Sequence, residues 1–201
     1  MKLLNKILLH LCFLIIVANT FSANKLDSLF WELKKAKSDT IIWSQYLKIG
    51  DYYENTNPDS AFFYYNKSLI HAVKNRLKKQ EATSLLYIGF VFEDIGNFEK
   101  AIAYYSTALK KYEKINDQIG LSRCYNNLGI VYSYLGYNKV AMSYFNIALQ
   151  LFKKQKDING ISNCLTNIGL IYSDEGNYEN ALKYLETSLS LFKEMKDQVG
   201  M

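Results

Sequence analysis

The residues that could support catalysis or bind a metal are few and scattered. The chain has two histidines and three cysteines. A single histidine such as His71 cannot form a metal site or a phosphorelay alone. The sequence contains no Walker loop, nucleophile elbow, paired-cysteine zinc pattern or dinucleotide fingerprint. The residue chemistry therefore predicts a protein without catalytic residues, bound metal or cofactor.

Two pairs of adjacent carboxylates are the remaining candidates for acid–base chemistry. They are Glu93–Asp94 and Asp174–Glu175. We interpret both pairs as solvated helix ends rather than as a catalytic acid and base. With no catalytic constellation in the sequence, we expect a protein that binds a partner.

A repeat with a constant spacing of 40 residues runs through the chain, marked by Ala61, Ala101, Ala141 and Ala181. A tyrosine follows each alanine by three positions, a small residue by seven and a leucine by eight. An Ile–Gly or Leu–Gly pair precedes each alanine. A fixed period in this range predicts a solenoid, whose long exposed groove favours binding over catalysis.

Each repeat has the pattern of two helices. In the last repeat, Leu165, Ile168, Gly169 and Tyr172 follow the spacing of a helical stripe. The turns are expected at Gly96, Gly136 and Gly176, because glycine tolerates the left-handed conformation that ends a helix. In the first repeat, Asn57 can cap a helix that begins at Pro58. The last helix is predicted from Tyr178 to about Glu194.

The small residues of the pattern have a steric role. Glycine in the first helix and alanine in the second allow the two helices to approach closely. Larger side chains fill the remaining gaps: Phe92, Tyr132 and Tyr172 from the first helices, and Tyr105, Phe145 and Leu185 from the second. We therefore interpret the 17 tyrosines mainly as packing residues rather than as a ligand site.

These positions resemble the tetratricopeptide repeat. The third repeat has the motif residues Tyr125, Leu128, Gly129, Tyr132, Gly136, Ala141, Phe145 and Ala148. The resemblance extends from about Thr40 to Met201 and implies an all-α fold, a right-handed superhelical solenoid of antiparallel helix pairs. The usual repeat has about 34 residues, so the longer period here is similar to kinesin-light-chain-like and bacterial signalling arrays.

The repeat and the pattern of the N-terminus divide the chain into segments. We expect a signal peptide over 1–22, an N-terminal capping helix over 23–39 and the solenoid over 40–201. The repeats are predicted at about 40–75, 76–116, 117–156 and 157–196, and a fifth is expected to begin at 197–201. The chain is thus expected to be part of a longer protein, or an array that a partner completes.

The N-terminus has the pattern of a secretory signal. Lys2 and Lys6 flank an apolar run over 7–18, and cleavage is expected after Ser22. An uncleaved anchor is the alternative, although the run is shorter than the ~20 residues of a membrane span. We expect an exported protein, periplasmic or in the cell envelope. Its membrane contact would be limited to this segment or to a span beyond Met201.

Cys124 and Cys164 occupy equivalent positions in adjacent repeats. Neighbouring helices lie about 8–10 Å apart, farther than the ~7 Å that a disulfide allows. We predict two free and mostly buried thiols, although an oxidising compartment would permit a bond. Without Lys2 and Lys6 the excess of basic residues is small, which argues against a nucleic-acid partner.

In the family the first helices line a concave groove that binds a peptide or protein. The resemblance places these residues there: Thr83, Tyr87, Arg123, Asn126, Asn127, Tyr134, Asn163, Asn167 and Asp174. In peptide-binding relatives an asparagine equivalent to Asn127 or Asn167 holds the peptide backbone. A local hydrogen bond is the alternative. The carboxylate clamp of chaperone adaptors is not reproduced, because Phe90, Ile130 and Leu170 replace its second asparagine.

The whole layout resembles the sensory region of tetratricopeptide-containing histidine kinases and related regulators of Bacteroidetes-like bacteria. It implies a non-enzymatic interaction module within a larger signal-transduction protein. The alternative is a free-standing exported adaptor that organises an envelope complex.

Overall fold

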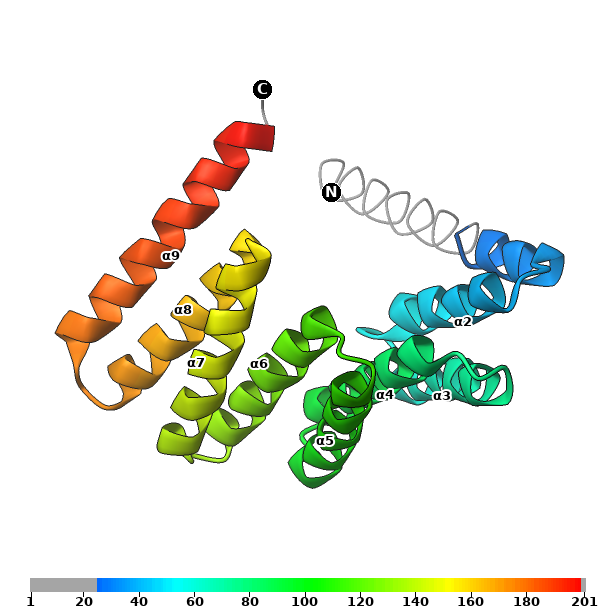
Figure 1. The fold of residues 1–201 in the computed structure, drawn as a ribbon, viewed down its shortest axis with the longest axis horizontal. Coiled ribbons are helices and arrows are strands. Elements are labelled where there is room, and N and C mark those ends of the chain that lie inside the picture. The colour runs from blue at the N-terminus through cyan, green and yellow to red at the C-terminus, as the bar shows by residue number, and fades with distance from the viewer. Residues whose placement is uncertain (1–24, 200–201) are drawn as a thin grey trace, which may run out of the picture. The chain divides into compact units, whose positions relative to one another are not determined.

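The computed structural model describes residues 25–199, and their side chains as far as Glu194. All regular structure in this part of the chain is α-helical. The chain divides after Asn75 into two compact units. The predicted signal peptide lies outside the described residues. The expected all-α solenoid of helix pairs is confirmed (Figure 1).

The first unit holds a helix over residues 25–35, α2 (Asp39–Tyr53) and α3 (Pro58–Lys74). The predicted cap of α3 is present, since Asn57 Oδ1 accepts a hydrogen bond from the Ser60 N–H at 3.0 Å. Gly50 of α2 faces the ring of Tyr65, which is fully buried. His71 is half-buried on α3, and its Nε2 lies 3.2 Å from Asp39 Oδ1.

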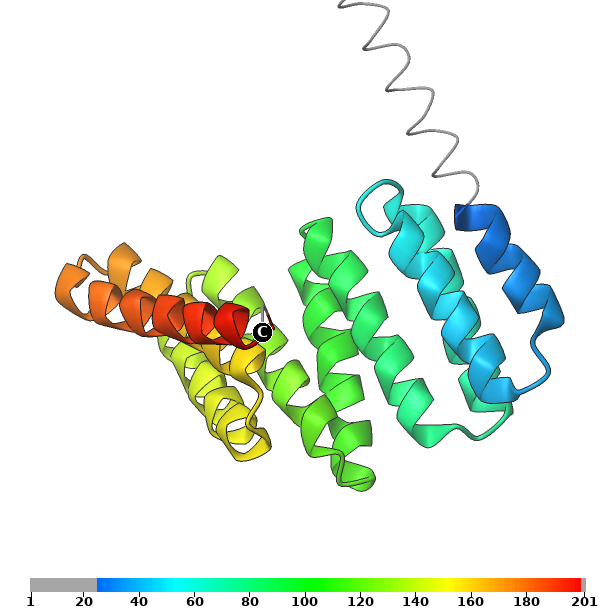
Figure 2. The ribbon, with the colours of Figure 1, turned by 90° about the horizontal axis from the view of Figure 1, so that it is seen from above.

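The second unit consists of three helix pairs. They are α4 (Lys78–Asp94) with α5 (Phe98–Lys114), α6 (Gln118–Tyr134) with α7 (Asn138–Gln155), and α8 (Ile158–Asp174) with α9 (Tyr178–Val199). Each helix packs against the next in sequence (Figure 2). The first helices also contact one another, α4 with α6 and α6 with α8. This line of first helices forms one face of the unit.

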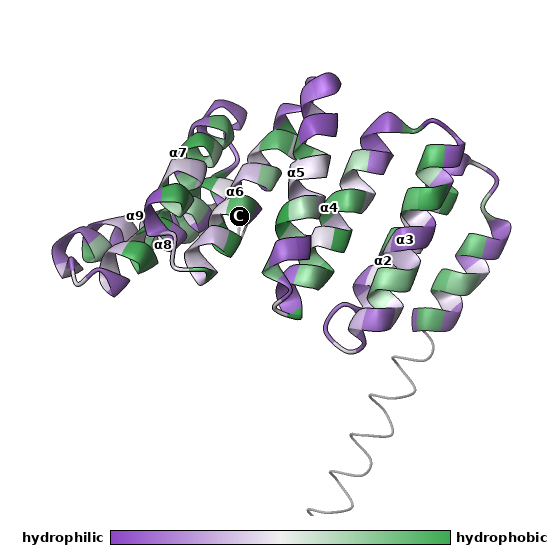
Figure 3. Cartoon of the chain, turned by 90° about the horizontal axis from the view of Figure 1, so that it is seen from below, coloured by the Kyte–Doolittle hydropathy of each residue, from purple (hydrophilic) through white to green (hydrophobic). Residues whose placement is uncertain are grey.

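The helix pairs pack as the repeat pattern predicts. The rings of Tyr105 and Phe145 lie against Gly89 and Gly129. Hydrophobic and hydrophilic positions alternate along the helices (Figure 3). The tyrosine that follows each repeat alanine is half-buried and stacked on an aromatic residue of the first helix, as with Tyr144 on Tyr132 at 5.4 Å between centroids. Cys124 and Cys164 are both free and fully buried, as expected.

The turns follow the predicted glycines, with φ of +73° at Gly96, +77° at Gly136 and +75° at Gly176. Helix α9 differs from the prediction, because it continues to Val199 instead of ending near Glu194. Helices α5 and α7 end where the next helix turns back along them. No described helix follows α9, and Leu189 and Phe192 on it are 53% and 39% exposed.

Candidate functional site

A hollow of about 330 Å³ opens on the face formed by the first helices of the second unit. Side chains of α4, α6 and α8, of the turn before α8 and of the end of α7 surround it. The lining residues are Leu86, Tyr87, Phe90, Arg123, Asn126, Asn127, Phe152, Asp157, Asn159, Gly160 and Asn163. We call it the α4–α6–α8 hollow. Its volume is at the lower end of the range for ligand pockets.

Five of the nine groove residues expected from the sequence line this hollow. They are Tyr87, Arg123, Asn126, Asn127 and Asn163. They come from three consecutive first helices, and contacts of α6 with α4 and α8 bring them together. Residues four apart on a helix share a face, so Arg123 and Asn127 lie one above the other on α6.

A chain of hydrogen bonds orients the amide groups on α6. Cys164 Sγ donates to Asn126 Oδ1 at 3.5 Å, and Asn126 Nδ2 contacts Asn127 Oδ1 at 3.4 Å. Burial raises the pKa of the Cys164 thiol to about 12, and the charge of Asp157 adds to this effect. The thiol therefore keeps its proton at neutral pH and can donate a hydrogen bond to Asn126. These contacts occupy the oxygen of Asn127 and leave its nitrogen for another partner.

Asn127 is 5% exposed, and its Nδ2 has no hydrogen-bond partner within the described part of the chain. A buried polar group without a partner costs about 1–3 kcal/mol, so native proteins seldom retain one. Asn127 is one of the residues that line the hollow. The donor itself is buried, so an incoming acceptor such as a peptide carbonyl would satisfy it only after neighbouring side chains had moved aside.

The apolar part of the hollow lining comes from α4 and from Phe152 near the end of α7. Leu86 and Phe152 are almost fully buried and contribute to the lining. The rings of Tyr87 and Phe90 meet edge to face, with centroids 5.9 Å apart. Phe90 in turn contacts the buried ring of Tyr105 in the same geometry at 5.9 Å. This surface suits an apolar side chain of a ligand.

The opposite side is polar and lies at the N-terminus of α8. Asp157 caps this helix, since its Oδ1 accepts from the Gly160 N–H at 3.0 Å. Asn159 and Asn163 follow on the exposed surface of the first two turns. The hollow thus joins amides and one guanidinium to an aromatic patch, a combination that fits a peptide better than a small apolar molecule.

The other four predicted residues lie outside the hollow lining. The Thr83 hydroxyl is 2.8 Å from the Tyr112 hydroxyl, within one helix pair. Tyr134 is 67% exposed and stacks on Phe98. Asn167 is half-buried and Asp174 is exposed. Asn127 is more buried than its counterpart Asn167 because α8 packs beside α6, whereas no described first helix follows α8.

Several lining residues were not anticipated as groove residues. Asp157, Asn159 and Gly160 belong to the first turn of α8, and Phe152 comes from the preceding helix. The repeat could have predicted the position of Asp157, because the equivalent residue of the preceding repeat, Asp117, caps α6 in the same way that Asp157 caps α8. Cys164 was interpreted only as a buried thiol, and its contact with Asn126 was not predicted.

The interpretation of Glu93–Asp94 as solvated was wrong for Glu93. Its Oε2 accepts a hydrogen bond from the Tyr105 hydroxyl at 2.6 Å. Burial raises the pKa of Glu93 to about 7, against the lowering effect of that hydrogen bond. The reason is the close contact of α4 with α5, which covers the carboxylate. Asp174 and Glu175 are exposed, as expected.

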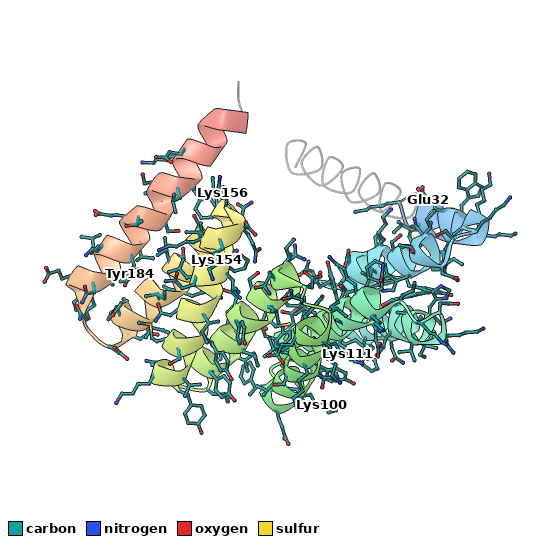
Figure 4. The ribbon with its side chains drawn as sticks, in the orientation of Figure 1. Glu32, Lys100, Lys111, Lys154, Lys156 and Tyr184 are labelled. Carbon is teal, nitrogen blue, oxygen red and sulfur yellow. The ribbon has the colours of Figure 1, made fainter. Side chains whose placement is uncertain are left out.

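Charged side chains elsewhere are mostly solvated. Lys154 and Lys156 project from the end of α7 (Figure 4). In residues 25–199 no three histidine, cysteine or acidic side chains converge as metal ligands. Within the same range, no helix is both long and apolar enough to cross a membrane.

Comparison with known families identifies the repeat. A family model described as tetratricopeptide repeat matches residues 80–154. A second model with the same description matches residues 162–194. Together they span more than half of the chain and all three helix pairs of the second unit. No curated protein matches the sequence.

Solved structures share the fold at low sequence identity. A Rap protein in complex with Competence and Sporulation Factor has a TM-score of 0.78 and 18% identity, over 92% of this chain and 53% of that one. The Rap conjugation gene regulator of plasmid pLS20, in complex with a Phr peptide, has a TM-score of 0.75 and 18% identity, over 90% of this chain and 52% of that one. Aspartyl phosphate phosphatase F from Bacillus subtilis has a TM-score of 0.75 and 15% identity, over 88% of this chain and 50% of that one. This chain spans about half the length of each.

Proposed function

The chain belongs to the tetratricopeptide-repeat family, and from that premise we propose that it is a non-enzymatic module that binds a peptide segment of a partner in the α4–α6–α8 hollow. The observation that supports this most directly is the unpartnered Nδ2 of Asn127, a residue that lines the hollow. An asparagine amide can donate to a carbonyl of an extended peptide. One of the similar structures was solved with a Phr peptide and another with Competence and Sporulation Factor.

The side chains around Asn127 support the same function. The network from Cys164 through Asn126 fixes the direction of the amide before a ligand arrives. Groups held in the bound orientation lose less entropy on binding, which increases affinity. The apolar patch of Tyr87 and Phe90 offers surface for a side chain next to the bound carbonyl.

Asn127→Leu tests the proposal because it separates binding from stability. Leucine has the same branched side-chain skeleton, and it removes the unsatisfied donor together with the oxygen that accepts from Asn126 Nδ2. We expect the urea midpoint of unfolding to stay the same or rise, while peptide affinity falls about tenfold, the contribution of one buried hydrogen bond. Calorimetry with a bound peptide and urea denaturation measure the two effects.

Thr166→Val is the matched control, because Thr166 lies on α8 outside the hollow, with its Oγ1 2.9 Å from Ser188 Oγ. It should reduce stability and leave affinity unchanged. If Asn127→Leu destabilised the protein and kept full affinity, Asn127 would be a packing residue, and the proposal that the hollow is the peptide-binding site would be contradicted.

We further propose that the module acts outside the cytoplasm as the sensory part of a bacterial signal-transduction protein. The basic flank at Lys2 and Lys6 and the apolar run over 7–18 support export. Fusion of alkaline phosphatase after Met201 should give an active reporter, and deletion of 1–22 should abolish this activity. An inactive full-length fusion that is nevertheless expressed would contradict export.

A further inference from the structure

We propose that the second unit also binds a second copy of this chain, edge to edge, by contacts separate from those proposed for a peptide. The chain reverses at every turn of the unit, because each helix packs against the next (Figure 2). The turns within the helix pairs, at 95–97, 135–137 and 175–177, form what we call the pair-turn edge. The start of α4 and the turns at 115–117 and 156–157 form the linker edge. The 17 residues of α4 span about 25 Å, which separates the two edges.

The two edges carry opposite charge. Exposed carboxylates gather at the first and last turns of the pair-turn edge: Asp94, Glu99, Asp174, Glu175 and Glu179. Exposed lysines gather on the linker edge: Lys78, Lys110, Lys114, Lys153, Lys154 and Lys156. Charges of the other sign are fewer on both edges: Lys100 and Lys139 on the first, and Glu81, Glu113, Asp117 and Asp157 on the second. The unit is therefore acidic along one edge and basic along the other.

This separation does not follow from stabilisation of the helices. Asp94 and Asp174 are the last residues of α4 and α8, where the partial negative charge of a helix end disfavours a carboxylate. Lys78 is the first residue of α4, where the partial positive charge disfavours a lysine. These three charges oppose the nearby helix dipole and agree with the charge of their edge. An electrostatic partner outside the unit explains their positions.

The middle turn of the pair-turn edge is aromatic where its neighbours are acidic. Tyr137 is 59% exposed and holds the N-cap position of α7, where its side chain forms no cap. Asn97 and Asn177 cap α5 and α9 at the equivalent positions, with hydrogen bonds of 3.2 and 3.3 Å. An exposed tyrosine thus stands where an asparagine would stabilise the helix. Beside it, Tyr134 is also exposed and stacks on Phe98, with centroids 5.6 Å apart.

The linker edge offers a matching hollow of about 210 Å³ between the start of α4 and the end of α5. Ile115 contributes an apolar surface, and Lys78, Lys111 and Lys114 line the rest together with Glu81. Glu81 Oε1 holds Lys111 Nζ at 2.6 Å. An ammonium group is attracted to the face of an aromatic ring. The hollow therefore suits a tyrosine presented by a second copy.

The two edges match turn by turn when two copies lie side by side in the same direction. The aromatic α6–α7 turn then meets the α5–α6 turn and the hollow beside it. The acidic α4–α5 and α8–α9 turns meet the lysines at the start of α4 and at the α7–α8 turn. The same helix pairs set the spacing on both edges, so a match at one turn extends to the others. An anionic lipid surface would use the linker edge alone and leave the carboxylates and tyrosines without a role.

Sedimentation equilibrium of the full chain tests this contact at about 0.05 M and about 0.5 M sodium chloride. At low salt we expect an average mass above that of the monomer that rises with protein concentration. The contact joins unlike edges, so it continues beyond a dimer. High salt should lower the mass, because it screens exposed charges.

Reversal of charge on one edge should weaken the association about tenfold or more, because like charges then face each other. Lys153→Glu with Lys154→Glu changes the linker edge, and Asp174→Lys with Glu175→Lys changes the pair-turn edge. An equimolar mixture of these two double variants should regain the mass of the parent, since each reversed turn then faces its reversed counterpart. This recovery also shows that both variants are folded. Association through the apolar run over 7–18 would be the same in every variant.

Tyr137→Ser tests the aromatic turn separately from the charges. We expect weaker association together with an unchanged or higher urea midpoint, because serine can cap α7. Asn127→Leu is the control from the α4–α6–α8 hollow and should leave the mass unchanged. Loss of peptide affinity in that variant thus concerns the proposed function alone.

Three results would overturn the contact between copies. The first is a parent chain that stays monomeric at low salt, and the second is a mixture of the charge variants that does not regain mass. The third is a monomeric parent that sediments with phosphatidylglycerol vesicles and loses this binding with Lys153→Glu and Lys154→Glu, which would make the linker edge a lipid-binding surface. Peptide binding in the α4–α6–α8 hollow would stand in each case.

Discussion

Gly89→Ala is expected to lower the free energy of unfolding by about 2 to 3 kcal/mol, although alanine is the better helix former by about 1 kcal/mol. A Cβ on Gly89 would lie 2.4 Å from Tyr105 Cε1 and 2.5 Å from Cδ1. The ring cannot move aside easily, because Tyr105 is fully buried and its hydroxyl is bound to Glu93. The two helices must therefore separate, and urea denaturation measures the loss.

Gly169→Ala is the matched control in the last repeat. There the new Cβ would meet Leu185 Cγ at 2.9 Å, Leu185 Cδ2 at 3.1 Å and the backbone oxygen of Ala181 at 3.3 Å. Leu185 is a half-buried aliphatic side chain that can change rotamer, and the contact with the oxygen is the longest of the three. We expect a loss below about 1 kcal/mol. The double variant Gly89→Ala with Tyr105→Leu reproduces the alanine–leucine pair of the Gly169→Ala variant. It should lose less free energy of unfolding than the sum of the losses from Gly89→Ala and Tyr105→Leu measured separately. Equal losses for Gly89→Ala and Gly169→Ala would contradict the steric explanation.

The repeat pattern predicted the fold well because it specifies contacts between adjacent helices. The glycine of a first helix and the large residue of its partner appear in each copy, so a single packing rule fixes all helix pairs. The left-handed turns at Gly96, Gly136 and Gly176 follow from glycine alone. The end of α9 was less predictable, because a helix end in such an array depends on the helix that packs after it.

The hollow was only partly predictable, because it is built by contacts between repeats. Position within a first helix identified Arg123 and Asn127, because the family resemblance implies that these positions face a groove, and both residues line the hollow. Whether an amide is buried or solvated depends on the neighbouring first helix, and Asn127 and Asn167 differ for this reason. The contact of Cys164 with Asn126 crosses between two repeats, so no local pattern contains it.

The free energy of unfolding is expected to fall as the pH rises from about 4.5 to about 7, by an amount on the order of 3 kcal/mol attributable to Glu93. In the unfolded chain this carboxyl has its ordinary pKa of 4.5, and in the folded chain burial raises the pKa to about 7. Between these values the native state holds a proton that the unfolded state has released. Raising the pH therefore favours unfolding until Glu93 is ionised in both states.

Glu93→Gln should remove most of this pH dependence, since glutamine is neutral and can still accept the Tyr105 hydrogen bond. Some dependence of the same sign should remain, because burial also raises the pKa of Asp51 and of Asp94. Glu99→Gln, at an exposed carboxylate in the first turn of α5, should leave the profile of the parent chain intact. Parallel profiles for the parent chain and Glu93→Gln, from urea denaturation at each pH, would show that Glu93 is not protonated in the folded state.

Tyr105→Phe provides a test with the opposite sign. The Tyr105 hydroxyl donates to Glu93 and so favours its charged form, which lowers the pKa against the effect of burial. Without that donor, the pKa of Glu93 should rise further, and the loss of stability should extend to higher pH. Glu93→Gln and Tyr105→Phe thus change the pH profile in opposite directions, because the first removes the titrating carboxyl and the second removes the donor that favours its charged form. A purely steric effect of the two substitutions would lower stability at every pH alike, so this divergence identifies the buried carboxylate as the origin of the pH dependence.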